Sequence, residues 1–385
     1  MSDALQLQWT EGGETHSARW RSEAQVPPPK RVHAVDDTLS ADAAWRLASE
    51  GAGLLWRSDY HNARQLLQAM ARRADRKPRR GQVAVPASAA EAFHLHRQAQ
   101  GQRSRTLGRL LIELEGDYGI TLPRAPDLRQ ACREAWGPAD GQPSVASLRE
   151  LLGLVGAHEW RKKGVEIPAL GPPPGNRVHP HYGVFSPVRG EYLDLVAKAP
   201  LPSKDLAFDI GTGTGVIAAI LARRGVRSVV ATDQDPRALT CARENLARLG
   251  LDDRVQVLQA DLFPTGTAPL IVCNPPWLPA RPSSPLERAI YDEGSRMLRG
   301  FLSGLAAHLA PAGEGWLVLS DLAEHLGLRS REELTELIHS AGLRVAGRSD
   351  VRPRHPKAAD ARDPLHAARA REVTSLWRLA LRTPA

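Results

Sequence analysis

The stretch FDIGTGTGVIAAILARRG, residues 208–225, decides the fold class of this 385-residue chain. An apolar segment leads into three glycines at alternate positions, and an apolar run of helical composition follows them. Glycine lets the backbone turn tightly and approach a ligand closely, because it has no Cβ. The pattern predicts a buried strand, a glycine turn and a helix. Its spacing differs from G-x-G-x-x-G, since residue 216 is Val, and this counts against a dinucleotide pyrophosphate site.

Short apolar segments alternate with helical ones on both sides of this turn. The expected strands are LAFDI (206–210), SVVAT (228–232), VQVLQA (255–260), LIVC (270–273) and GWLVLS (315–320). The helix expected over 236–249 has Pro236 in its first turn, where proline fits. Strands that alternate with helices predict a mainly parallel sheet covered on both faces, with ligands beyond the carboxyl ends of its strands.

An aspartate stands at each of three successive strand ends, namely Asp209, Asp233 and Asp261. A carboxylate before the glycines can meet an ammonium group, and one at the end of the next strand can accept both ribose hydroxyls. Asp261 is expected within reach of an adenine amino group. An ammonium group, a ribose and an adenine, without a phosphate, describe S-adenosyl-L-methionine.

The segment CNPPW, residues 273–277, ends a buried strand abruptly. The Asn274 side-chain oxygen and the Pro275 carbonyl are two acceptors that can hold the hydrogens of a planar nitrogen. That nitrogen is a poor nucleophile until its lone pair points at a methyl donor, so positioning and electrostatics supply the catalysis. Proline restricts the residue before it, so Pro275 and Pro276 hold the acceptors still. Trp277 offers a flat face on which a base can stack.

The region from about 182 to 380 resembles the class I S-adenosylmethionine-dependent methyltransferases, and CNPPW resembles their [DN]PP[YFW] motif. The resemblance implies a Rossmann-like α/β domain with a seven-stranded sheet whose last strand is antiparallel, with LRVAGRSDV (343–351) and REVTSLWRLAL (371–381) as the final strands. It assigns catalysis to Asn274, Pro275, Pro276 and Trp277. The implied cofactor residues are Phe185, Asp209, Gly211, Thr212, Gly213, Gly215, Asp233, Asp261 and Leu262.

The first 165 residues are expected to form a mainly helical substrate-recognition domain. They begin with alternating apolar residues around Gly12-Gly13, typical of a hairpin, and helical spacing follows, for example at Leu107, Leu110, Leu111 and Leu114. Residues 166–180, EIPALGPPPGNRVHP, have the Pro/Gly density of a stiff, extended linker. The methyltransferase domain then covers residues 181–385. The segment 291–302 is expected to be a packing helix whose acidic start either borders the acceptor pocket or caps the helix, with capping favoured.

The methyl acceptor stays open at this point. The resembling group includes enzymes for adenine or guanine amino groups in RNA and DNA, and HemK-type enzymes for a release-factor glutamine amide. The basic segments favour nucleic acid, RNA above all, and they are RRADRKPRR (72–80), RSRTLGR (103–109), RKK (161–163) and RPRHPK (352–357). A protein amide is the alternative, followed by a small molecule. A cofactor-binding regulator without catalysis is a further alternative, although Asn274 and the glycines are intact.

The composition excludes several other classes of protein. The net charge of +8 and the pI near 9.7 agree with an anionic partner. Three scattered cysteines and the lack of a signal-like start predict a cytoplasmic protein, and no apolar run is long enough to span a membrane. The pairs His94/His96 and His179/His181 lack an evident third ligand, so no metal site is expected. The sequence leaves the oligomeric state open.

Overall fold

The computed structural model describes residues 5–75, 86–188, 190–284, 286–353, 360 and 363–382. The chain divides into two compact units. One comprises residues 1–86 and 94–159, and the other comprises residues 87–93 and 160–385. The candidate site lies wholly in the second unit, called the C-terminal unit.

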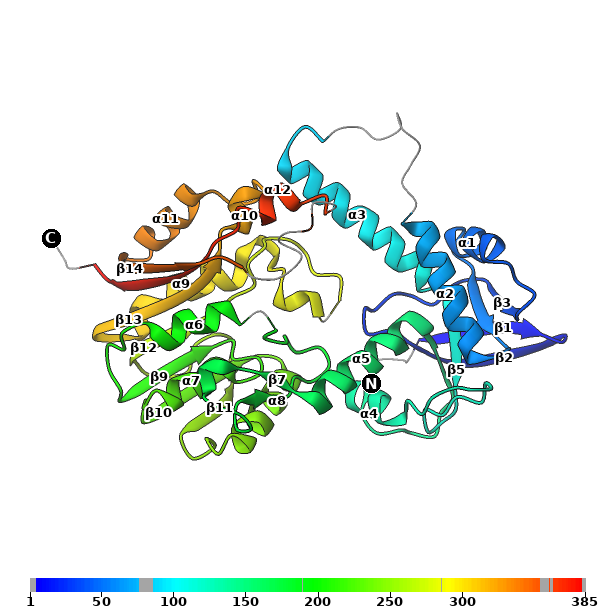
Figure 1. The fold of residues 1–385 in the computed structure, drawn as a ribbon, viewed down its shortest axis with the longest axis horizontal. Helices are drawn as coiled ribbons and strands as arrows, with labels where there is room; N and C mark the ends of the chain where they lie inside the picture. The colour runs from blue at the N-terminus through cyan, green and yellow to red at the C-terminus, as the bar shows by residue number, and fades with distance from the viewer. Residues whose placement is uncertain are drawn as a thin grey trace. The chain divides into compact units, whose positions relative to one another are not determined.

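The C-terminal unit is built on a seven-stranded sheet with the order β11-β10-β9-β12-β13-β15-β14 (Figure 1). Its strands are β9 (Leu206–Ile210), β10 (Ser228–Asp233), β11 (Val255–Gln259), β12 (Ala268–Cys273), β13 (Leu309–Ser320), β14 (Leu343–Val351) and β15 (Thr374–Leu381). Neighbouring strands pair in parallel, except that β15 is antiparallel to both β13 and β14. The predicted mainly parallel sheet with an antiparallel last strand is confirmed.

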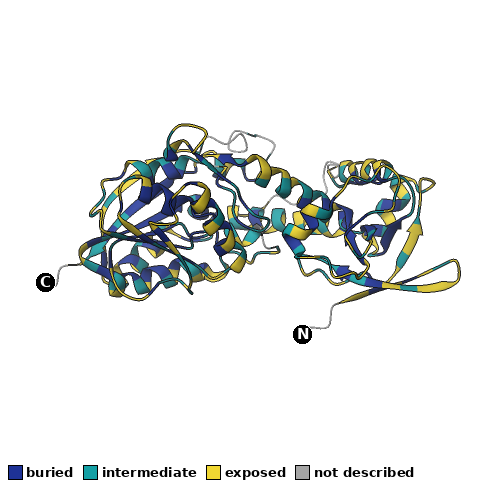
Figure 2. Ribbon diagram, turned by 90° about the horizontal axis from the view of Figure 1, so that it is seen from below, coloured by how far each residue is buried: buried dark blue, intermediate teal, exposed yellow. Residues whose placement is uncertain are grey.

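Helices cover both faces of this sheet, because successive strand residues point to opposite sides. Ala207 and Val272 pack in one core cluster with α6 (Glu191–Lys198), α7 (Val216–Arg223) and α8 (Pro236–Arg248). Phe208 and Ile271 pack in the other, with α9 (Arg296–His308) and α11 (Arg331–Ser340). Figure 2 shows the strands dark blue, as buried elements, beneath helices whose outer faces are exposed. The near-continuous apolar composition of β9 and β12 follows from this double burial.

The predicted linker over 166–180 is wrong, because this segment packs as part of the C-terminal unit. The strands β7 (Val165–Glu166) and β8 (Arg177–Val178) form an antiparallel pair around the 3-10 helix η1 (Pro168–Leu170). Ile167, Leu170 and Val178 are buried in the core cluster that includes α7. Apolar residues spaced among the prolines and glycines supply the burial that a free linker lacks. The division between the units falls instead at residues 159/160, within α5 (Leu148–Lys163).

The N-terminal unit differs from the expected mainly helical domain, since it holds a six-stranded sheet with the order β1-β2-β6-β5-β4-β3. The strands are β1 (Gln6–Glu11), β2 (Glu14–Arg21), β3 (Val32–Val35), β4 (Gly53–Trp56), β5 (Leu110–Leu114) and β6 (Ser144–Ser147). The helices are α1 (Ala41–Ser49), α2 (Tyr60–Ala74), α3 (Ala89–Leu107), α4 (Arg129–Trp136) and most of α5. The predicted hairpin is confirmed as β1–β2.

The strand β5 explains why this sheet was not predicted. Leu110, Leu111 and Leu114 have helical spacing, but they lie on a strand of which four of the five residues are buried. A short apolar run that is buried on both faces has no alternation, so periodicity alone does not separate a strand from a helix.

The first turns of α3 belong to the C-terminal unit, although the rest of that helix does not. Phe93 is 1% exposed and packs in an apolar cluster with Leu278, Leu322 and Leu326. Its ring centroid lies 6.4 Å from that of Tyr291. A segment distant in sequence therefore completes the core of the C-terminal unit.

Asn245 of α8 ties three segments of the C-terminal unit together. It is 1% exposed, its side-chain oxygen accepts the His179 N–H (2.7 Å), and its side-chain nitrogen donates to the Thr214 carbonyl (3.0 Å).

We expect Asn245→Leu to lower the free energy of unfolding by about 2–4 kcal/mol, since it leaves two buried backbone groups unpaired. Urea unfolding followed by circular dichroism measures this change. Arg248→Ala, on the exposed side of the same helix, serves as the control, and an equal loss in both variants contradicts the prediction.

Candidate active site

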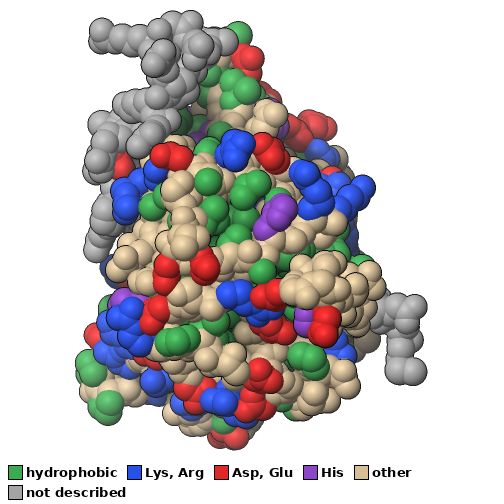
Figure 3. All heavy atoms as spheres, turned by 90° about the vertical axis from the view of Figure 1, so that its right-hand side faces the viewer, with side chains coloured by type: hydrophobic (Ala, Val, Ile, Leu, Met, Phe, Trp, Pro, Cys, Tyr) green, Lys and Arg blue, Asp and Glu red, His purple; other side chains and the backbone are tan. Residues whose placement is uncertain are grey.

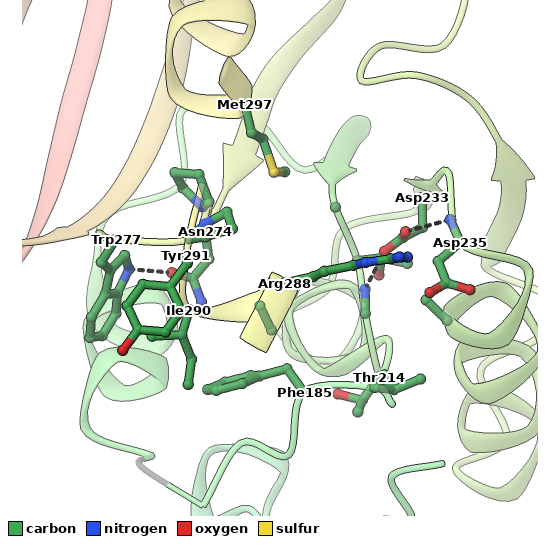
Figure 4. A pocket seen from close by; sticks show the side chains of 18 of the residues that line it. Phe185, Thr214, Asp233, Asp235, Asn274, Trp277, Arg288, Ile290, Tyr291 and Met297 are labelled. Carbon is green, nitrogen blue, oxygen red and sulfur yellow. Dashed lines mark hydrogen bonds between the residues drawn. The ribbon is translucent and has the colours of Figure 1, made fainter. Parts of the chain in front are cut away.

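A cavity of about 840 Å³ lies at the carboxyl ends of the central strands of the C-terminal unit. The glycine turn after β9, the end of β10 and the segment after β12 all contribute to its wall. Figure 4 shows Asn274, Trp277 and Tyr291 on one side of the cavity and Asp233 and Asp235 on the other. The structure thus brings together segments that are separated by up to about 60 residues in the sequence.

The glycine turn between β9 and α7 requires glycine because of its backbone conformation. Gly211, Gly213 and Gly215 have φ angles of 72°, 55° and 80°, in the left-handed region that other residues rarely adopt. The Met297 side chain, at the start of α9, lies against Gly211. The turn therefore stays narrow, and Gly211, Thr212 and Gly213 present their backbone to the cavity.

Asp209 lies beneath the turn and is not part of the cavity wall. Its carboxylate is 1% exposed, and Oδ2 accepts the Thr212 hydroxyl (2.6 Å) and the Ala218 N–H (3.0 Å) at the start of α7. Its Oδ1 is buried and has no hydrogen-bond partner among the described residues. Burial raises the pKa of Asp209 to about 6. An unpaired buried carboxylate oxygen can stabilise a nearby cation, because no hydrogen-bond donor among the described residues offsets its negative charge.

Asp233 does line the cavity, at the end of β10. Its two oxygens accept the N–H groups of Gly213 and Asp235, both at 3.0 Å. Burial raises the pKa of Asp233, and these backbone hydrogen bonds oppose that rise. Each carboxylate oxygen keeps acceptor capacity, so that the side chain can receive two hydroxyl groups of a ligand.

Gly215 and Asp261 are predicted cofactor residues that, like Asp209, do not line the cavity. The Asp261 side chain is 62% exposed and pairs with Arg296 (2.9 Å). Leu262 does line the cavity, with a φ of 74°, and its carbonyl accepts the Thr232 hydroxyl (2.6 Å). The left-handed conformation of Leu262 turns the chain after β11, so the residue that follows Asp261, and not Asp261 itself, faces inward. Phe185, from the segment before α6, also lines the cavity, as expected.

Asn274, Pro275, Pro276 and Trp277 all line the cavity at the end of β12. The Trp277 indole N–H donates to the Asn274 Oδ1 at 3.0 Å. Trp277 is half-buried, packs against the core clusters of both sheet faces, and meets the ring of Tyr192 edge-on at 6.4 Å. Its indole is thus less open than the freely exposed stacking face that the sequence predicts.

The loop after this motif adds residues that the sequence analysis did not identify. Leu278 N–H donates to the Ile290 carbonyl (3.1 Å) and Asp292 N–H to the Leu278 carbonyl (2.9 Å), so the loop folds back along the cavity. This return places Arg288, Ile290 and Tyr291 on the cavity wall. The signal that could have found them is the length of chain between CNPPW and α9, which must close over the strand ends.

The expected capping role of the acidic segment before α9 is borne out by the backbone contacts. The Asp292 Oδ2 accepts the N–H of Met297 (2.8 Å) and, more weakly, that of Leu298 (3.3 Å). Burial raises the pKa of Asp292. This carboxylate therefore caps the start of α9, while Met297, the second residue of the helix, contributes to the cavity.

Two residues from the segment before β15 complete the wall. Arg369 forms an ion pair with Asp363 (2.8 Å). Glu372 is 2% exposed, and its Oε1 accepts the Ser320 hydroxyl (2.8 Å). No motif marks this segment, so only the pairing of β15 with β13 brings it to the site.

Other chemistries receive no support from the part of the chain that the structure describes. No group of three or more His, Cys, Asp or Glu side chains in it could hold a metal ion. Cys132, Cys241 and Cys273 are buried, and burial raises the thiol pKa of each. Among the residues that the structure describes, no helix is long and apolar enough to cross a membrane.

Comparisons with known proteins show the family to which the chain belongs. Residues 176–337 match the family model of the methyltransferase small domain. A release factor glutamine methyltransferase from Cereibacter sphaeroides is 32% identical over 47% of this chain and 65% of its own length. A tRNA1(Val) (adenine(37)-N6)-methyltransferase from Aeromonas salmonicida is 32% identical over 40% of this chain and 69% of its own length.

The alignments leave part of each release-factor relative uncovered, since the chain spans between half and two thirds of their length. Among solved structures, a SAM-dependent methyltransferase from Geobacter sulfurreducens in complex with S-adenosyl-L-homocysteine aligns with 50% of this chain and 90% of its own. The identity is 16% and the TM-score 0.34. On the sequence matches, the chain belongs to the S-adenosylmethionine-dependent methyltransferases that carry a methyltransferase small domain.

Proposed function

We propose that this protein transfers the methyl group of S-adenosylmethionine to a planar nitrogen. The observation that carries the proposal is the shared cavity, in which Asn274, Pro275 and Pro276 face the same space as the glycine turn and Asp233. A methyl donor held by the turn and an acceptor held by the motif would then meet without crossing solvent. A regulator without catalysis needs no such pair of acceptors.

The cofactor half of the cavity offers partners for each part of S-adenosylmethionine. Asp209 lies beneath the cavity wall, so its unpaired Oδ1 would meet the ammonium group through a bridging water. Asp233 is the acceptor for the ribose hydroxyls, and Leu262 with Phe185 provides apolar contact for the adenine. Asp261 is not proposed as a contact, because it pairs with Arg296 outside the cavity. When bound, the cofactor supplies the electrophilic methyl group.

The acceptor half has the groups that a planar nitrogen requires. Oxygen atoms of Asn274 and Pro275 accept the two N–H hydrogens, so the lone pair turns out of conjugation toward the methyl group. Each hydrogen bond strengthens as positive charge develops on the nitrogen in the transition state. Pro275 is buried and Asn274 half-buried, which keeps competing water away from these acceptors.

We propose an exocyclic amine of a nucleobase as the acceptor. One cavity offers the faces of Pro276, Trp277 and Tyr291 to a flat ring, and Arg288 to an anion. Arg288 is exposed and forms no ion pair with another described residue, unlike Arg296 and Arg369, which also line the cavity. A guanidinium beside an aromatic slot suits a base and its phosphate.

A side-chain amide of a protein is the second candidate, and the state of the basic segments favours it. Arg103 pairs with Asp75 and Arg161 with Glu244, so these cations are partly neutralised within the protein. Arg109 is half-buried, and this desolvation lowers its pKa. On the face shown in Figure 3, Lys and Arg side chains are interspersed with Asp and Glu. Residues 76–80 and 354–357, which hold the rest of the predicted basic segments, lie outside the described residues.

Substitution of Asn274 tests the proposed transfer. We expect Asn274→Ala to lower kcat by about 10²–10³-fold, the cost of losing one preorganised acceptor at a charge that develops in the transition state. The dissociation constant for S-adenosylmethionine, measured by calorimetry, should stay within about twofold of the value for the unmodified protein, since Asn274 is not among the proposed cofactor contacts. Asn62→Ala, an equivalent change in the N-terminal unit, is the control. An unchanged kcat in Asn274→Ala removes the assigned role.

The raised pKa of Asp209 makes cofactor affinity depend on pH. Below about pH 6 the carboxyl is protonated and no longer attracts an ammonium group. Affinity for S-adenosylmethionine should therefore rise by roughly tenfold from pH 5 to pH 7 and then level off. In Asp209→Asn the affinity should be lower at pH 7 and flat over this range. Calorimetric titrations at fixed ionic strength give both curves, and parallel curves would contradict the role of Asp209.

Transfer from tritiated S-adenosylmethionine decides between the two acceptors. Purified protein is incubated with an extract from a strain that lacks it, and Asn274→Ala serves as the blank. We expect label that ribonuclease releases and protease does not, recovered as a base methylated on its exocyclic nitrogen. Label released only by protease and recovered as N5-methylglutamine would establish the second candidate instead.

A further inference from the structure

The Trp277 side chain has a polar contact that its role as a flat surface does not explain. Its indole N–H donates to the Asn274 Oδ1 at 3.0 Å, three residues back along the chain. Figure 4 shows this bond on the cavity wall, between the two labelled side chains of the motif. The oxygen that accepts it is the same one that the proposed function assigns to the methyl acceptor.

An asparagine amide has two ends of nearly equal shape and opposite hydrogen-bonding character. The indole N–H is a donor only, so it selects the orientation in which the amide oxygen faces it and the amide nitrogen points away. The other aromatic residues that fit the motif would not make this selection. Phe has no donor, and a Tyr hydroxyl can donate or accept, so it tolerates either orientation. The carbonyl oxygen still has a second lone pair for a ligand.

The indole is itself held firmly enough to act as a fixed donor. It packs against both core clusters of the C-terminal unit. The ring of Tyr192, which is 2% exposed, stands perpendicular to it, with an interplanar angle of 89° and ring centroids 6.4 Å apart. Edge-to-face contacts of this kind have a preferred geometry and restrict rotation of the ring.

We propose that Trp277 is a positioning residue: its indole N–H fixes the Asn274 amide in the one orientation that presents oxygen to a planar nitrogen, and Tyr192 fixes the indole. The inference rests on the proposed function for its effect on catalysis. The contact itself can be tested without any methyl acceptor.

Trp277→Phe keeps an aromatic face and removes the donor. We expect kcat to fall about five- to tenfold, the effect of one hydrogen bond, while the KM for S-adenosylmethionine changes less than about twofold. Asn274→Asp provides the sharper comparison, because either oxygen of a carboxylate can accept. In the Asn274→Asp variant, Trp277→Phe should lower kcat by less than about twofold. Trp160→Phe, on a half-exposed indole outside the cavity, is the matched control.

A purely structural role for Trp277 predicts a different result, namely a lower melting temperature and the same loss of kcat in both backgrounds. That outcome, or an unchanged kcat in Trp277→Phe, overturns the proposal.

The indole ¹⁵N–¹H resonance tests the contact independently of activity. Trp277→Phe identifies the signal by its disappearance. In the unmodified protein we expect slow hydrogen exchange, and in Asn274→Ala exchange at least about tenfold faster with a shifted proton frequency. An identical signal in both proteins would show that the bond does not form. If the unmodified protein transfers no methyl group to any extract, the proposed function fails, while this spectrum still decides the orientation of Asn274.

Discussion

Parallel pairing of β9 with β10 on one side and β12 on the other is the constraint on which the site depends. These three strands finish at one edge of the sheet, so Gly211, Asp233 and Asn274 are brought together by hydrogen bonding of the backbone and not by contacts among their side chains. The chain runs from β9 to β10 and β11 on one side and then crosses to β12 on the other side of β9, and the cavity lies where the strand order reverses. Helix α9 closes one side of that hollow, because Met297 lies against the glycine turn.

Two carboxylates lie at the glycine-turn side of the site, Asp233 on the cavity wall and Asp209 beneath it. Asp209 and Asp233 are both desolvated, and burial raises the pKa of each. Backbone N–H groups satisfy part of their charge, but the Asp209 Oδ1 stays without a partner among the described residues. Such a site costs stability in the absence of a ligand, and a cationic ligand recovers that cost on binding.

The sequence predicted the elements that repeat a strong local pattern. A few neighbouring residues are enough to predict the glycine turn, the helix start at Pro236 and the apolar strands. The placement of Asn274 and Trp277 on the cavity wall was predicted in the same way. Asp261 shows the limit, because one left-handed residue, Leu262, decides which side chain faces the cavity. The N-terminal sheet shows another, since Leu110, Leu111 and Leu114 suit a helix and a buried strand equally well. Arg288 and Glu372 reach the site because segments distant in the sequence pair through backbone hydrogen bonds. No local sequence pattern predicts such pairing.

The placement of Phe93 bears on how this protein can be divided or recombined. The backbone passes between the two units at residues 86/87, 93/94 and 159/160, so a single cut does not separate them. A fragment starting at residue 160 would keep the whole seven-stranded sheet but lose the Phe93 side chain. This loss would leave an apolar cavity beside Leu278, Leu322 and Leu326, next to Tyr291. The C-terminal unit is thus not formed by one continuous stretch of chain, because Phe93 of α3 fills part of its interior.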